Sequence, residues 1–194
     1  WNFDADNRKS FGRAGPGLVP RPPSFTPDPI TRDVIEMVAA RFSAHPGQAH
    51  LFEGPVTREQ AQSVLRDFIE HRLSAFGYYQ DAMATGEPLL YHSALSAVLN
   101  LHLLDPREVV AAAVESYDAG RAPLNAVEGF VRQVLGWREF IRGIYWQEMP
   151  GYAALNALGA HAPVPAAYWG GQTEMNCVRQ CATQLVDTAY THHI

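Results

Sequence analysis

The 194-residue sequence is poor in cysteine, in charged residues and in long apolar runs. Its two cysteines, Cys177 and Cys181, are too few for a disulfide framework, which favours a reducing compartment. It shows no secretory leader and no apolar run of roughly 18 residues, so we expect a cytoplasmic protein without a membrane span. The net charge of −5 argues against a uniformly basic surface for nucleic acid, although a local basic patch stays open.

Strand patterns are missing as well. No stretch of useful length alternates apolar and polar residues, whereas several stretches have a helical period. The chain is long enough for one domain with a sizeable core, and we predict an all-α fold. Apolar stripes and capping residues predict helices over residues 31–42, from Thr57 to a stop at Gly77, from Asp105 onward, from Asn125 through Trp146, and from Asn176 to Ile194.

Residues 1–29 have the composition of a linker. Six prolines between Gly15 and Pro29 favour extended backbone that lies on a surface. The sequence starts at Trp1 without Met and reaches Ile194 within a predicted helix, where a cap and a turn would normally follow. We therefore expect an internal piece of a longer protein.

The helix predicted to contain residues 129–146 carries two stripes of side chains. Beside an apolar stripe runs a polar one, Gln133, Arg138 and Arg142, which offers amide and guanidinium donors. An arginine beside Trp137 suits a planar anionic ligand, because the guanidinium can bind phosphate in a fork and the indole can stack. A buried core helix whose arginines pair with carboxylates explains the same pattern, so both interpretations stay open.

Two further segments could carry chemistry. Residues 92–96 combine an imidazole, two hydroxyls and the free N–H groups of a helix start, which together suit an anion. The alternative is that Ser93 simply caps that helix. Cys177 and Cys181 lie one helical turn apart and could form half of a metal site or a buried thiol pair.

Several segments resemble the photolyase/cryptochrome family. Val-Arg-Gln-Val-Leu-Gly-Trp-Arg-Glu-Phe-Ile-Arg-Gly-Ile-Tyr-Trp, residues 131–146, resembles its Trp-Arg-Glu helix and is closest to the bacterial iron–sulfur branch, the prokaryotic (6-4) photolyases. Met-Asn-Cys at 175–177, with a His-His pair fifteen residues further on, resembles the same branch. The resemblance implies that residues 1–29 are an interdomain connector and residues 30–194 the central part of the α-helical FAD-binding domain. The N-terminal antenna domain, with its chromophore, and the C-terminal remainder would lie outside this piece.

The resemblance also implies roles for individual residues. Those implied to contact FAD are His92, Ser93, Leu95, Ser96 and Arg138, and those implied to line the lesion side of the flavin cavity are Gln133 and Trp137. Trp169, otherwise a core aromatic, would pass electrons to the flavin. Cys177 would be the first of four ligands of a 4Fe–4S cluster whose other ligands lie beyond residue 194, and Cys181 is interpreted as a core residue. His193 would be the proton donor in the lesion pocket.

The implied function is light-driven repair of the (6-4) pyrimidine photoproduct in UV-damaged DNA by electron transfer from reduced FAD. We expect a monomeric lyase, of which this piece alone is inactive. A blue-light photoreceptor of the cryptochrome type, without repair activity, is an alternative that these residues do not separate from it. A flavin-free helical interaction module is a third possibility, disfavoured because the 92–96 segment and Arg138 occur together.

Overall fold

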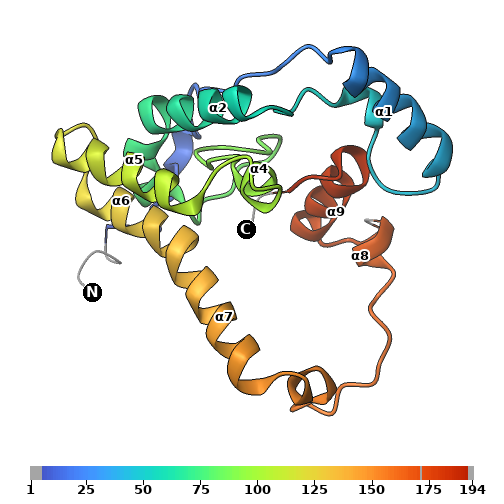
Figure 1. The fold of residues 1–194 in the computed structure, drawn as a ribbon. Helices are drawn as coiled ribbons and strands as arrows, with labels where there is room; N and C mark the ends of the chain where they lie inside the picture. The colour runs from blue at the N-terminus through green and yellow to red at the C-terminus, as the bar shows by residue number, and fades with distance from the viewer. Residues whose placement is uncertain (1–5, 171, 192–194) are drawn as a thin grey trace.

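The computed structural model describes residues 6–170 and 172–191, and all regular secondary structure in this part is helical (Figure 1), which confirms the predicted all-α fold. The α-helices are, in chain order, α1 (Pro29–Arg41), α2 (Arg58–His71), α3 (Leu73–Tyr79), α4 (Ser96–Asn100), α5 (Pro106–Asp118), α6 (Leu124–Val131), α7 (Trp137–Glu148), α8 (Ala167–Gly170) and α9 (Asn176–Thr188). A π-helical segment, Arg132–Gly136, joins α6 to α7. None of the helices described is both long and apolar enough to cross a membrane.

Helices α2 to α6 form the packed part of the molecule. Helix α3 packs against α2 and α6, and α5 also packs against both α2 and α6. Phe68, Phe76 and Phe130, one from each of α2, α3 and α6, meet in the core with ring centroids 4.8 to 6.1 Å apart. Truncating one such buried ring to alanine typically costs about 3–5 kcal/mol, so these helices form a rigid base.

The prediction that Gly77 ends a helix is wrong, because Gly77 lies buried within α3. A Cβ atom at this position would lie 2.6 Å from the Cα of Ala126 in α6. The glycine therefore permits two helix backbones to approach closely. The predicted single helix is instead two, because α2 ends at His71 and α3 begins at Leu73.

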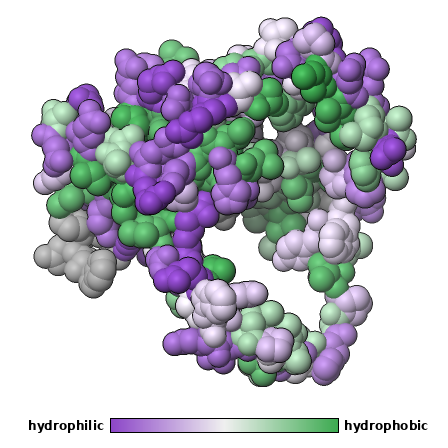
Figure 2. Space-filling model, in the orientation of Figure 1, coloured by the Kyte–Doolittle hydropathy of each residue, from purple (hydrophilic) through white to green (hydrophobic). Residues whose placement is uncertain are grey.

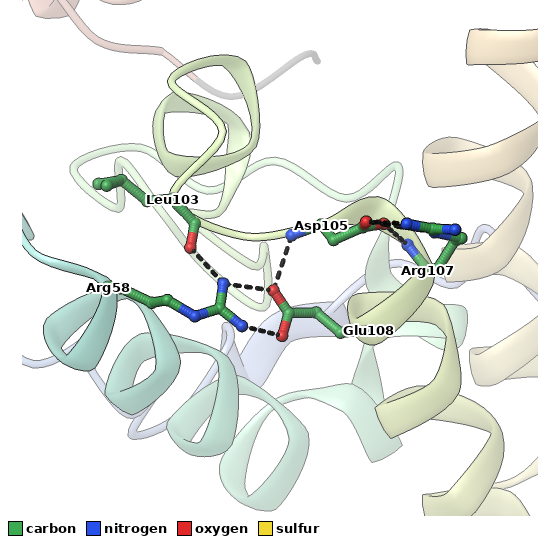
Figure 3. A network of polar contacts seen from close by, with 5 residues as sticks. All are labelled: Arg58, Leu103, Asp105, Arg107 and Glu108. Carbon is green, nitrogen blue, oxygen red and sulfur yellow. Dashed lines mark hydrogen bonds and ion pairs between the residues drawn. The ribbon is translucent and has the colours of Figure 1, made fainter.

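The starts of α2 and α5 are held together by a polar network (Figure 3). The two terminal nitrogens of Arg58 donate to the two carboxylate oxygens of Glu108 at 3.0 and 2.8 Å, and one of them also donates to the carbonyl of Leu103. Glu108 accepts from the amide of Asp105, completing the capping box predicted at this helix start. Hydrogen bonds from Arg107 lower the pKa of Asp105 to about 2. The Asp105 carboxylate, which caps α5 by accepting from the Arg107 amide, is therefore protonated only as the pH falls towards that value.

Two other predicted caps have different outcomes. The capping box at Thr57 is confirmed, with Gln60 as its partner. The cap predicted at Asn125 is wrong, because α6 begins after Pro123 and the buried Asn125 side chain donates to Asn7 at 3.1 Å. Asn125 thus serves a contact with a distant part of the chain.

The last predicted helix is shorter than expected. Asn176 is the first residue of α9 and not its cap, which is Met175. The helix ends at Thr188, and Ala189 has a left-handed backbone with φ 54°, so the prediction of a helix through Ile194 is wrong. Residues 192–194, including the predicted catalytic His193, lie outside the described residues.

The segment before α1 is anchored to the packed helices. Its described part has only one short 3₁₀ turn, Gly12–Ala14, as its linker composition suggests. Asn7 is buried, Arg8 pairs with Asp81, and the Phe11 ring stacks on Tyr79 at 4.6 Å. Its role as an interdomain connector stays a prediction.

Helix α7 extends away from the packed helices, and the chain then returns through a long loop to α8 and α9 (Figure 1). No residue of α7 is buried, and the space-filling view shows the molecule opening between this arm and the rest (Figure 2). One side of α7 is therefore exposed where it leaves the core.

Helix α9 is joined to the loop after α1 by a backbone hydrogen bond, in which the amide of Gly47 donates to the carbonyl of Val186 at 2.6 Å.

Candidate functional site

A cavity of about 930 Å³ lies where the packed helices meet α7. This volume is near the upper end of the range of roughly 300–1,000 Å³ that ligand pockets occupy. Its walls come from α3, from residues 92–100, from the α6–π–α7 helix and from the chain just after α9. The cavity is therefore assembled from four separate parts of the sequence.

The residues that line this one cavity include those predicted to contact FAD and two of those predicted for the lesion pocket: His92, Ser93, Leu95, Ser96, Gln133, Trp137 and Arg138. The third residue predicted for the lesion pocket, His193, lies outside the described residues. Sequence reasoning linked them only by resemblance, because residues 92–96 and 133–138 are far apart in the chain. Folding brings the hydroxyls of the first group and the guanidinium and indole of the second to the wall of one cavity. Their individual roles remain predictions.

The backbone of residues 92–96 has an unusual local conformation. Ala94 has a left-handed φ of 59°, a conformation that is strained for residues other than glycine and is often found at functional sites. The Ser93 hydroxyl accepts from the amide of Leu95 at 3.4 Å, and α4, which follows, has no side-chain cap. The alternative that Ser93 serves as the cap of that helix is therefore wrong.

A buried ion pair supports this segment from behind. The Arg72 side chain is fully buried and pairs with Asp67 at 2.6 Å. Its Nε donates to the carbonyl of His92 at 3.3 Å, and a terminal nitrogen donates to the carbonyl of Pro20. Removing one partner of a buried pair typically costs about 3–5 kcal/mol, because the other charge is left uncompensated. Arg72 thus fixes the position of His92, whose ring lies edge-on to Phe76.

Two arginines of α7 line the cavity, and they differ in whether a carboxylate of the described residues pairs with them. Arg142 pairs with Glu139 at 3.1 Å, as a helix with internally compensated arginines would show. Arg138 has no ion pair with any carboxylate in the part of the chain that the structure describes. Its guanidinium can therefore bind an anion in the cavity without first breaking a salt bridge.

The π-helical segment lies in the wall of the cavity. The amide of Trp137 donates to the carbonyl of Arg132, five residues earlier, so Gln133 and Val134 precede a local change in helical phase. Such π-helical segments often occur at functional sites. A Cβ atom added at Gly136 or Gly143 would meet none of the neighbouring atoms within 4 Å. That side of the helix is open among the described residues.

The other predicted residues that the structure describes lie outside the cavity lining. Trp169 is 72% exposed on α8, and is not a core aromatic. Cys177 and Cys181 are both exposed free thiols, so the interpretation of Cys181 as a core residue is wrong. Among the described residues no three His, Cys, Asp or Glu side chains gather to hold a metal. Cys177 offers one of the four ligands that a 4Fe–4S cluster requires, so the described residues alone do not fit one.

Sequence reasoning missed several residues of the cavity wall. The apolar ones, such as Phe76 and Phe130, had the period of ordinary core residues. Tyr190 and Thr191 follow α9 and reach the cavity only through the tertiary fold. No local pattern in the sequence marks them.

Comparison with known proteins places the chain in a family. The family model for deoxyribodipyrimidine photo-lyase-related proteins matches residues 1–53. A (6-4) photolyase of Agrobacterium fabrum is 46% identical over 195 aligned positions, covering 100% of this chain. The chain belongs to the photolyase family. It spans 38% of the length of that Agrobacterium relative.

A second match is shorter. An uncharacterized protein of Acanthamoeba polyphaga mimivirus, R853, is 38% identical over 68 residues, which cover 34% of this chain and 52% of the viral one.

Proposed function

We propose that the protein binds FAD in this cavity and uses it for light-driven repair of UV-damaged DNA, with the (6-4) pyrimidine photoproduct as its lesion. The substrate class is supported by the relative named as a (6-4) photolyase, which aligns along the whole of this chain. The cofactor is supported by the chemistry of the cavity wall.

One observation carries the proposal. Two separate segments, residues 92–96 and 133–138, meet on a single cavity, and Arg138 enters it without a carboxylate partner among the described residues. Serine hydroxyls and a guanidinium are the donors that a diphosphate requires. Phe76, Leu95 and Ile141 add apolar wall for the ring systems of a dinucleotide. Volume and donors therefore both fit FAD.

The protein's own residues would bind and orient the two reactants. A reduced flavin, when bound, supplies an electron after it absorbs light. Trp137, 58% exposed at the cavity, offers a stacking face for a damaged base that has been flipped out of the duplex. Gln133 beside it can hydrogen-bond to the edge of that base.

Two further assignments belong to this proposal and rest on the resemblance. Cys177 is the first ligand of a 4Fe–4S cluster, and the other three ligands come from outside this sequence. Trp169 passes electrons to the flavin from the protein surface, where its exposed ring lies.

Arg138→Ala in the full-length protein tests the cofactor assignment. A charge-assisted hydrogen bond is worth about 1.5–3 kcal/mol, so the variant should bind FAD about ten- to a hundredfold more weakly. Flavin absorbance per protein after gel filtration measures retention. Arg121→Ala changes an exposed arginine outside the cavity lining and should retain flavin. Unchanged flavin in the Arg138 variant would contradict its role, and a wild-type protein that takes up no flavin would contradict the proposal as a whole.

A further inference from the structure

Two residues just after α9 belong to the wall of the cavity. Tyr190 and Thr191 line it, whereas no described residue of α9 itself belongs to the hydrophobic core cluster. The carbonyl of Tyr190 accepts from Thr188 Oγ1 at 2.9 Å and from Gln184 Nε2 at 3.2 Å, which joins this part of the wall to the last turn of α9. The wall at Tyr190 therefore lies where the end of α9 is held.

The loop after α1, residues 42–48, contacts that end of α9 directly. Carbonyls in the last turn of a helix lack partners within the helix, and one of them, of Val186, accepts from the amide of Gly47 at 2.6 Å. A Cβ atom added at Gly47 would lie 2.8 Å from the Cβ of Ala189 and 3.4 Å from its backbone nitrogen. The loop can therefore approach α9 this closely only without a side chain at position 47.

Glycine and alanine have unusual places at this contact. A left-handed residue directly after a helix is usually glycine, but here it is Ala189, with φ 54°. The glycine stands across the contact, at position 47. A second cavity, of about 840 Å³, lies beside them and is lined by α1 together with Thr188 and Ala189. Because this space lies between α1 and the end of α9, the loop, and not α1, makes the backbone contact.

We propose that Gly47 is a positioning residue for the first cavity: it admits the loop against Ala189 and so holds Tyr190 and Thr191 where they complete the wall around the bound ligand. The inference rests on the proposed function, in which that ligand is FAD. Gly47 lies outside the lining of the first cavity and acts through the end of α9, not by touching the ligand.

The FAD affinity of full-length Gly47→Ala tests this. Two carbons in contact normally lie about 3.5–4.0 Å apart, so the added methyl must separate residues 47 and 189 by about 1 Å. The apo-protein can relieve this overpacking by displacing the wall at Tyr190, and FAD binding must then restore the wall. Kd should therefore rise about five- to fiftyfold. Titration of apo-protein with FAD, followed by flavin fluorescence, measures it.

A rescue variant and a matched control separate this contact from backbone strain. Ala189→Gly removes the carbon that the new methyl would meet, so the double variant Gly47→Ala/Ala189→Gly should bind FAD within about twofold of the wild type. Gly86 also has a left-handed backbone, with φ 82°, but an added Cβ atom there would meet none of the neighbouring atoms within 4 Å. Gly86→Ala should therefore carry similar strain and bind FAD like the wild type.

Three outcomes would overturn the inference. The first is an unchanged Kd in Gly47→Ala, and the second is a double variant that binds FAD as weakly as Gly47→Ala. The third is loss of helical circular dichroism in the apo-protein of both variants, which would show that Gly47 is required for folding and does not position the wall. A wild-type protein without FAD affinity would instead refute both this inference and the proposed function.

Discussion

Cys177 and Cys181 offer a comparison between two residues in similar surroundings. Both are exposed thiols on α9, one turn apart, and neither has a neighbouring group of metal ligands in the described structure. Local environment therefore gives no reason for one to bind iron and the other not. The resemblance to the iron–sulfur branch assigns a ligand role to Cys177 alone.

This difference leads to a prediction at the residue scale. Cys177→Ser in the full-length protein should lower iron content, because a cluster then loses one of its four thiolates. Cys181→Ser should keep the iron of the wild type. Iron per protein, with the visible absorbance of the cluster, measures both. Equal loss in the two variants would show that the ligand is misassigned.

Helix packing gives the next prediction, at the scale of elements. Gly77→Ala would place a methyl carbon 2.6 Å from Ala126 Cα and 2.9 Å from the backbone carbon of Asn125, so α3 and α6 must separate. Overpacking of this kind costs about 1–3 kcal/mol, and displaced backbone makes the upper end the expectation. Denaturation followed by circular dichroism should show a lower midpoint.

Gly143→Ala is the matched control, because it is also a glycine within a helix. No atom lies within 4 Å of its Cβ position. Its substitution should stabilise α7 by about 0.5–1 kcal/mol, since alanine has the higher helix propensity. If both substitutions shifted the midpoint in the same direction, close helix contact would not be the reason for Gly77.

The elements also indicate how far the sequence alone could lead. The capping boxes at Thr57 and Asp105 were predictable because all their partners lie within three residues. Gly77 was misread because a glycine that ends a helix and one that admits a second helix look alike in sequence. Asn125 was misread because its partner, Asn7, is 118 residues away.

The same distinction holds for the cavity. Residues 92–96 and 133–138 carried local motifs, and those motifs led to the residues that now line it. The π-helical segment Arg132–Gly136 gave no local signal, because its sequence has an ordinary helical period. Tyr190 depends on where the chain turns after α9, and its carbonyl accepts hydrogen bonds there from Gln184 and Thr188.

At the scale of the whole molecule, α9 links two candidate sites. Cys177 lies in its first turn, and the chain after its last turn reaches the cavity at Tyr190 and Thr191. A helix of 13 residues is about 20 Å long, so one metal cannot be shared between the two ends. A metal ion bound by Cys177 would therefore lie away from the cavity end of α9.

The final prediction concerns the activity of the whole protein under light. His193 follows Thr191, which lines the cavity, by two residues in the sequence. Repair of a (6-4) photoproduct moves a hydroxyl group back between two bases, and a positioned proton donor supplies about 10²–10⁴ in rate. His193→Ala in the full-length protein should therefore bind and photoreduce flavin normally, yet lose nearly all repair of (6-4)-damaged DNA under blue light.

His192→Ala is the control for this prediction, since the imidazole of His192 is adjacent in the sequence but has no assigned role in proton transfer. It should act through packing or cofactor geometry and lower repair and photoreduction together. Both activities are to be measured on one preparation of each variant, so that loss of flavin is not mistaken for loss of chemistry. Full repair by the His193 variant would remove its catalytic assignment. A wild-type protein that photoreduces its flavin but never repairs DNA would instead favour the photoreceptor, because electron supply and cavity would then be intact without the reaction they were proposed to serve.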